Sequence, residues 1–221
     1  MKSDLTELVI ILDTSGSMVN VAKDMEGAIN NLLEEQKKEP GQLNVTLTKF
    51  SNSVNFIFDN KNVNEVQPIS LNPGGFTALY DAIGLTVDNV GRRLNTTLEQ
   101  NRPSKVIVAI VTDGDENNSR TYSSAKVKEL IEQQRNKYSW TFTFLGADHD
   151  AILAARAVGI DAGNAANYVK TSAGIGNLGK TFSGKMSAVR GMTQDSYNAA
   201  VGGGGAVSYT QEDRDILNSN V

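Results

Sequence analysis

The chain lacks cysteine, and among its 221 residues it has a single histidine. Without cysteine, a disulfide framework and thiolate metal sites are excluded. Because His149 is the single histidine, the sequence gives no support for a zinc site or a catalytic triad. His149 follows an expected strand, in the loop 146–150. We expect it to be an exposed loop or helix-capping residue, with contact to a partner as the alternative.

An excess of basic residues and a long apolar run are also missing. The net charge is −4, so no broad attraction to nucleic acid or to an anionic membrane is expected. No segment is apolar for long enough to span a bilayer, and the first residues lack the apolar core of a signal peptide. We therefore expect a cytoplasmic protein that binds neither nucleic acid nor membrane. Its 39% hydrophobic and 21% charged residues are typical of a globular chain.

What is present begins with an apolar run that ends in an acid. Residues 8–12 are too few to cross a membrane and suit a strand buried on both faces. Asp13 follows at the carboxyl end of this strand, where open α/β sheets place their ligands. Ser15 and Ser17 come next, at alternate positions. One carboxylate and two hydroxyls at such spacing are typical of a site for a hard cation such as Mg²⁺ or Mn²⁺.

The apolar patterns alternate between strand and helix along the chain. The sequence predicts strands at residues 8–12, 43–50, 54–58, 104–111, 140–145 and 168–169. It predicts helices over residues 21–39, 78–98, from 123 or 124 onward, 151–158, 178–189 and after 210. This order predicts an α/β fold with a Rossmann-like, doubly wound, mostly parallel sheet, one antiparallel edge strand and helices on both faces.

The composition changes near Thr171, where glycine, serine, alanine and asparagine become frequent. We expect one domain over residues 1–170 and a helical extension over 171–201 that packs on or beside it. Residues 202–221 are expected to form a Gly-rich linker and a short terminal helix.

Two further segments bring oxygen ligands to the same edge of the predicted sheet. Thr77 ends a Gly-rich loop before a helix, and Asp113 ends a second buried strand. Three hydroxyls, two carboxylates and waters suit the octahedral oxygen shell of Mg²⁺. The alternative is that these are ordinary turn and cap residues. The predicted metal ligands are Asp13, Ser15, Ser17, Thr77 and Asp113.

These motifs, in this order and spacing, resemble the von Willebrand factor type A (VWA) domain with its metal-ion-dependent adhesion site (MIDAS). The matching stretches are 13–17, 74–83 and 112–114, and the resemblance covers about residues 6–169. It implies that the Ser15, Ser17 and Thr77 hydroxyls bind the metal directly, whereas Asp13 and Asp113 act mainly through water. One departure is Phe76, where many members have a small residue.

The resemblance also implies a function. We expect an intracellular, metal-dependent protein-binding module whose cation coordinates an Asp or Glu of a partner protein. The expected metal is Mg²⁺ or Mn²⁺, ahead of Ca²⁺. The coordinating set has no general base or nucleophile beside it, so we do not expect an enzyme. Similar intracellular proteins of bacteria and phages imply an ATPase or a stress-response assembly as the setting.

Two alternatives remain open from the sequence. Residues 174–181 match the phosphate-binding pattern Gly-x4-Gly-Lys-Thr, which would use Lys180 and Thr181 to bind a nucleotide. The segment before it is short and polar, whereas this pattern needs a buried strand. The other alternative is a structural protein with a vestigial metal site. The acids Asp81, Asp115 and Glu116 are expected to be solvated charges, with a place at the rim of the site as the alternative.

Overall fold

The structure is a computed structural model that describes residues 1–147 and 151–220. Its sheet has the strand order β3-β2-β1-β4-β5-β6, in which only β3 runs antiparallel to its neighbour. The strands are β1 (Lys2–Asp13), β2 (Gln42–Phe50), β3 (Val54–Asn62), β4 (Pro103–Thr112), β5 (Thr141–Ala147) and β6 (Ala165–Tyr168). The α-helices are α1 (Ala22–Lys38), α2 (Leu79–Thr96), α3 (Ser124–Tyr138), α4 (Ala151–Ala157), α5 (Ser172–Gly191), α6 (Gln194–Gly202) and α7 (Gln211–Leu217). Short 3-10 helices cover Gly16–Val21, Val63–Glu65, Glu99–Asn101 and Ala162–Asn164.

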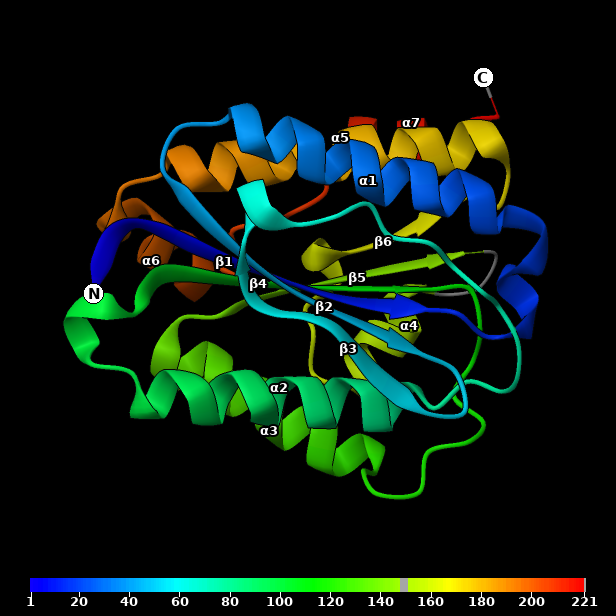
Figure 1. Cartoon of the computed structure of the whole chain (residues 1–221), viewed down its shortest axis with the longest axis horizontal. Coiled ribbons are helices and arrows are strands. Elements are labelled where there is room, and N and C mark those ends of the chain that lie inside the picture. The colour runs from blue at the N-terminus through cyan, green and yellow to red at the C-terminus, as the bar shows by residue number, and fades with distance from the viewer. Residues whose placement is uncertain (148–150, 221) are drawn as a thin grey trace.

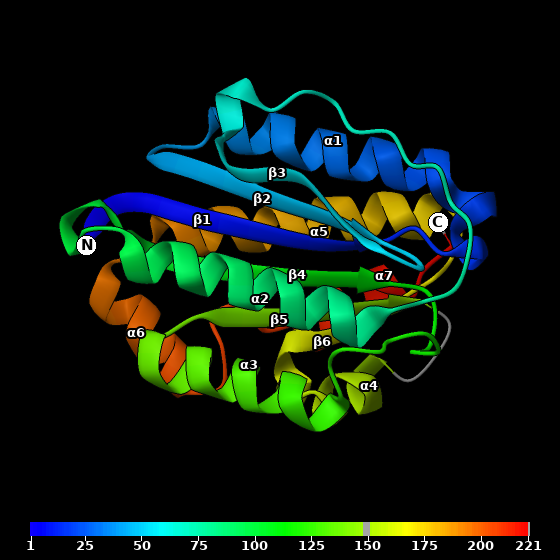
Figure 2. The same ribbon diagram turned by 60° about the horizontal axis from the view of Figure 1, so that its bottom comes forward.

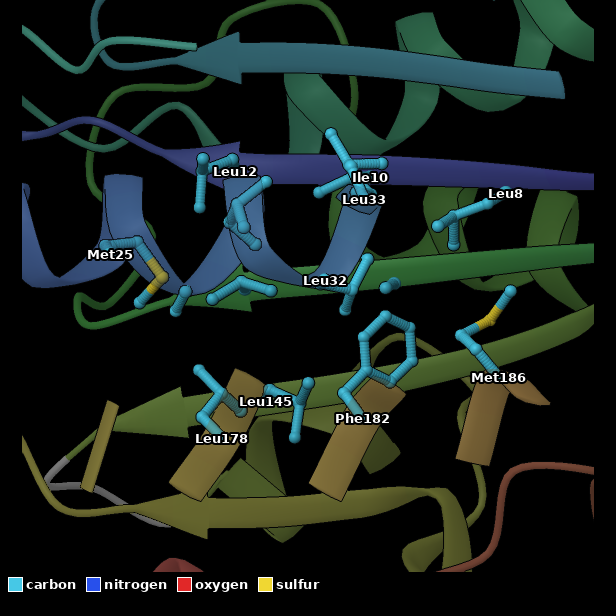
Figure 3. Close-up of a cluster of buried hydrophobic side chains, with 14 of the residues drawn as sticks. Leu8, Ile10, Leu12, Met25, Leu32, Leu33, Leu145, Leu178, Phe182 and Met186 are labelled. Carbon is cyan, nitrogen blue, oxygen red and sulfur yellow. The ribbon is translucent and has the colours of Figure 1, made fainter. Parts of the chain in front are cut away.

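Helices cover both faces of the sheet, as the sequence predicts (Figure 1). Side chains of β1 alternate between the two layers because successive residues of a strand point to opposite faces. Leu8, Ile10 and Leu12 pack with α1 and α5 (Figure 3). Val9 and Ile11 pack with α2 and α3 on the other face. The predicted Rossmann-like fold with one antiparallel edge strand is confirmed.

Some elements extend further than their apolar patterns. β1 begins at Lys2, which pairs with Pro103, rather than at residue 8. β6 begins at Ala165, three residues before the predicted strand, because it pairs with β5 although alanine has little preference for strands.

Helix α2 runs unbroken through Gly84. A Cβ at Gly84 would lie 2.3 Å from the ring of Tyr122, so close packing accounts for this glycine.

The predicted phosphate-binding pattern, residues 174–181, lies inside helix α5. Gly174 N–H donates to Thr171 Oγ1, Ile175 N–H donates to the Thr171 carbonyl, and the later N–H groups are bonded within the helix, so they cannot surround a phosphate. Gly179 serves packing instead: a Cβ at this position would lie 3.2 Å from Cβ of Ala28 on α1. The structure thus contradicts the alternative of a nucleotide site formed by Lys180 and Thr181.

The last fifty residues continue on the α1 face of the sheet, where α5, α6 and α7 contribute to the same buried cluster. The Gly-rich stretch expected as a linker forms a turn after α6, in which Asn164 Nδ2 donates to the Gly204 carbonyl at 2.7 Å. Thr210 and Asp213 form the capping box of α7. The division of the chain at residues 170 and 201 stays a prediction. No helix in residues 1–147 and 151–220 is long and apolar enough to cross a membrane.

Candidate metal centre

The sheet brings two acids together at the point where its strand order reverses. The chain leaves β1 toward β2, and it leaves β4 toward β5 on the opposite side. β1 and β4 are parallel neighbours in which Leu12 pairs with Val111, so they end at the same edge (Figure 2). Asp13 ends β1 and Asp113 follows the last residue of β4. This is the kind of crevice in which open α/β sheets bind ligands.

The carboxylate of Asp13 is fully buried and held by neutral donors. Its Oδ1 accepts a hydrogen bond from the Ser15 backbone N–H at 2.7 Å, and its Oδ2 accepts one from Thr112 Oγ1 at 2.6 Å. Burial raises the pKa of Asp13 above its ordinary value, against the opposing effect of these hydrogen bonds, and the nearby charge of Asp113 adds to the rise. A cation beside Asp13 would therefore relieve an unfavourable buried charge.

A chain of hydroxyls connects this carboxylate to the second acid. Ser15 Oγ lies 3.0 Å from Ser17 Oγ, which in turn donates to Asp113 Oδ1 at 2.5 Å. The hydroxyl of Thr77 lies beside them: a Cβ built on Gly114 would be 3.1 Å from Thr77 Oγ1 and 3.7 Å from Ser17 Oγ. The structure thus places all five predicted ligand residues at one edge of the sheet.

Backbone hydrogen bonds lock the loop before Thr77 onto the loop after β1. Gly74 N–H donates to the Thr14 carbonyl at 2.9 Å, and Gly16 N–H donates to the Gly75 carbonyl at 3.1 Å. Gly75 has a φ of +83°, a left-handed conformation that glycine adopts without steric cost. Glycine is therefore required at this turn, which delivers Thr77 to the site.

The loop after Asp113 is tied to the start of α2 by two acids that were expected to be solvated. The Glu116 carboxylate accepts from the backbone N–H groups of Tyr80, Asn118 and Ser119. The Asp81 carboxylate accepts from the N–H groups of residues 120–122. Both acids hold the loop in place because they satisfy backbone donors that have no helical partner. Asp115 is exposed.

Lys170 is a residue of the site that the sequence reasoning missed. Its Nζ lies 2.5 Å from Asp113 Oδ2 and donates to the Ser17 carbonyl at 2.6 Å. The only signal in the sequence is its place directly after the last predicted strand, at the same edge of the sheet. The loop of Asp148 and His149 lies outside the described residues.

The oxygen ligands fit a hard divalent cation. Among residues 1–147 and 151–220, no three His, Asp or Glu side chains gather into a metal-ligating group, so a cation at this edge would need the hydroxyls. Asp113 Oδ2 is buried and accepts no hydrogen bond from the part of the chain that the structure describes. Lys170 Nζ pairs with this oxygen by charge, and a carboxylate oxygen beside several hydroxyls is suited to a metal or to a water bound to it.

The sequence profile of the von Willebrand factor type A domain matches residues 7–180. No curated protein matches the chain. Among solved structures, the chain is similar to proximal thread matrix protein 1 from the mussel byssus with a zinc-occupied MIDAS motif, at a TM-score of 0.58 and 14% identity over 84% of this chain and 46% of that one. It is also similar to a von Willebrand factor type A protein from Catenulispora acidiphila, at a TM-score of 0.54 and 15% identity over 84% of this chain and 43% of that one. The chain thus spans less than half the length of these proteins, and at such identity the likeness shows the fold.

Proposed function

The chain belongs to the von Willebrand factor type A family, and from this premise we propose that it is a metal-dependent protein-binding module. The hydroxyls of Ser15, Ser17 and Thr77 would hold a divalent cation, together with the carboxylates of Asp13 and Asp113. The cation would supply a positive centre to which an Asp or Glu of a partner protein binds.

One observation carries this proposal: the hydroxyl of Ser17 lies between Ser15 Oγ, at 3.0 Å, and Asp113 Oδ1, at 2.5 Å. If the neutral hydroxyls bind the cation directly and the acids act through water, less of the cation's charge is cancelled, so it can still attract a carboxylate from outside. Family members generally act as interaction modules, which agrees with this arrangement.

Exposed apolar side chains beside the site support a protein as the partner. Phe76, next to Thr77, is 63% exposed, and Val19, two residues after Ser17, is 58% exposed. Large exposed apolar side chains close to a polar site are typical of interaction surfaces. The expected partner therefore offers an acidic side chain with apolar neighbours.

We further propose Mg²⁺ or Mn²⁺ as the metal. The zinc-occupied MIDAS belongs to the mussel protein. In this chain the five residues offer only oxygen atoms, whereas zinc is bound mostly by nitrogen and sulfur. A cytoplasmic setting with an ATPase or a stress-response assembly is part of the same proposal.

The first test is a calorimetric titration with Mg²⁺ and Mn²⁺ of the wild type, Asp13→Ala and Asp115→Ala. Asp115 is an exposed acid two residues after Asp113 that is not among the predicted ligands, and it serves as the matched control. We expect binding in the wild type and in Asp115→Ala, and none in Asp13→Ala. The proposal fails if the wild type gives no heat and no thermal stabilisation with either metal.

The second test concerns the partner. Isolation on the immobilised chain, with and without EDTA, should release the partner only when the metal is removed. Asp13→Ala should retain the fold, as checked by circular dichroism, and lose the partner. Binding that persists unchanged in EDTA would contradict the proposal.

A further inference from the structure

The candidate metal centre contains a positive charge of its own. The Asp113 side chain is 0% exposed, and the Lys170 side chain, 22% exposed, closes over it. Nζ forms an ion pair with Asp113 Oδ2 at 2.5 Å. It also donates a hydrogen bond to the Ser17 carbonyl at 2.6 Å. One ammonium group therefore contacts two of the five predicted ligand residues.

The backbone holds this lysine from both sides. Before it, Val169 N–H donates to the Leu217 carbonyl at 3.1 Å. After it, Thr171 caps helix α5 by accepting a hydrogen bond from Gly174 N–H at 3.2 Å, and Ser172 Oγ donates to Asp24 Oδ2 at 2.8 Å. Lys170 thus projects from a fixed junction between β6 and α5, and its reach to the site does not depend on a loose loop.

The ammonium group of Lys170 affects both Asp113 and any cation bound beside it. The ammonium neutralises Asp113, which would otherwise be a buried charge beside Asp13. A divalent cation bound to the same group of oxygens would lie within a few ångströms of this ammonium and would be repelled by it. The cation and Lys170 therefore compete for one carboxylate.

We propose that Lys170 is an affinity-determining residue that competes with the divalent cation for Asp113 and so weakens metal binding. The inference rests on the proposed metal site. With Lys170 in place, the site keeps its ligands oriented in the absence of metal, and the metal must displace the ammonium from Asp113 when it binds.

The test is the affinity for Mn²⁺, measured by the loss of its free electron paramagnetic resonance signal and by calorimetry. The samples are the wild type, Lys170→Met, Lys170→Arg and Lys185→Met. Lys185 is a matched control, because it is also 22% exposed and pairs with an acid, Asp213, away from the site. We expect Lys170→Met to bind Mn²⁺ about tenfold tighter than the wild type, given the repulsion between charges a few ångströms apart in a partly buried site. Lys170→Arg and Lys185→Met should stay within about twofold of the wild type, since both keep the charge beside Asp113.

A second measurement separates competition from a merely structural role. Without metal, Lys170→Met should have a lower melting temperature than the wild type, because Asp113 loses its counter-charge. With saturating Mn²⁺ it should gain more than the wild type gains. If the wild type and Lys170→Met bind Mn²⁺ equally well, this inference is overturned and the metal site stands. If neither binds Mn²⁺, the proposed metal site fails and the inference with it.

Discussion

Strand β1 carries two buried carboxylates, Glu7 near its middle and Asp13 at its end, and their surroundings differ. Glu7 faces the guanidinium of Arg93, whose Nη1 donates to Oε2 at 3.2 Å and whose Nη2 donates to Oε1, while Thr46 Oγ1 donates to Oε1 at 3.0 Å. Within the part of the chain that the structure describes, the hydrogen bonds to Asp13 come from neutral groups, one of them the Thr112 hydroxyl.

The difference separates a structural acid, Glu7, from an acid of the candidate metal centre, Asp13. The guanidinium of Arg93 on α2 cancels the charge of Glu7 within the fold, and both carboxylate oxygens of Glu7 accept hydrogen bonds. The hydrogen-bond partners of Asp13 are neutral, burial raises its pKa, and it lies at the edge where open α/β sheets bind ligands. Burial of an acid therefore says little about function until its partners are known.

The largest effect should come from breaking the structural pair. Arg93→Met leaves the fully buried Glu7 without its counter-charge, which should lower the free energy of unfolding by about 3–5 kcal/mol. Urea denaturation measures this loss. Arg92, at the preceding position of α2, is exposed, and Arg92→Met should change stability by less than about 0.5 kcal/mol. Similar losses of stability in the two variants would contradict the structural role of the ion pair between Glu7 and Arg93.

The next effect is metal-dependent and concerns the other acid. If the site binds Mg²⁺, a concentration of about one hundred times the dissociation constant should stabilise the wild type by about 2.7 kcal/mol. Ser17→Ala removes the hydroxyl between Ser15 and Asp113 and should abolish this gain. Ser53→Ala, in the turn between β2 and β3, should keep it. Thermal unfolding with and without Mg²⁺ measures the gain, and full protection of Ser17→Ala by Mg²⁺ would count against a direct role of this hydroxyl.

A smaller effect on stability is expected when either acid is replaced by its amide, and it should have opposite signs at Asp13 and Glu7. Because burial raises the pKa of Asp13, its ionised form is less favourable in the folded than in the unfolded chain. Without metal, stability is therefore lost as the pH rises from the ordinary value of 3.8 through the raised pKa. Asp13→Asn should be more stable than the wild type above this window, whereas Glu7→Gln should be less stable. Denaturation in EDTA at pH 4 to 8 measures both, and a loss of stability in Asp13→Asn would contradict the comparison.

The smallest effect is expected at Glu26 on α1, which holds the long loop that leads to Thr77. Hydrogen bonds from Lys23 and from the Leu71 backbone N–H lower the pKa of Glu26 below its ordinary value of 4.5. Its contribution to stability is therefore present above pH 4.5 and is lost as the pH falls through the lowered pKa. Glu26→Gln should be less stable than the wild type by about 1 kcal/mol at pH 7 and equally stable in strong acid. A difference that is the same at pH 7 and in strong acid would show that the charge of Glu26 does not matter.

The chain's local patterns were sufficient for the main elements and for the sheet edge that carries the site. Buried apolar runs that end in Asp13 and Asp113 predict parallel strands with their acids at one edge, because side-chain burial and strand direction follow from the pattern. The capping box at Thr210 was also recognisable, since a cap depends on residues three positions apart. Such features involve neighbours in sequence or the general geometry of α/β sheets.

What the sequence could not reveal depends on which segments meet in space. Residues 174–181 have the spacing of a phosphate-binding loop, yet they lie in helix α5, where Gly179 packs against Ala28 on α1. In the sequence, Lys170 is a polar residue after a strand, with nothing to mark it as special. In the structure, the junction of β6 and α5 lies beside Asp113 and Ser17, and this contact makes Lys170 part of the candidate site. The proposed oxygen ligands can be predicted from the order of residues because each of them follows its own strand or loop. The positive charge beside them belongs to Lys170, which is more than fifty residues after Asp113 in the sequence. Only tertiary packing brings this lysine to the site.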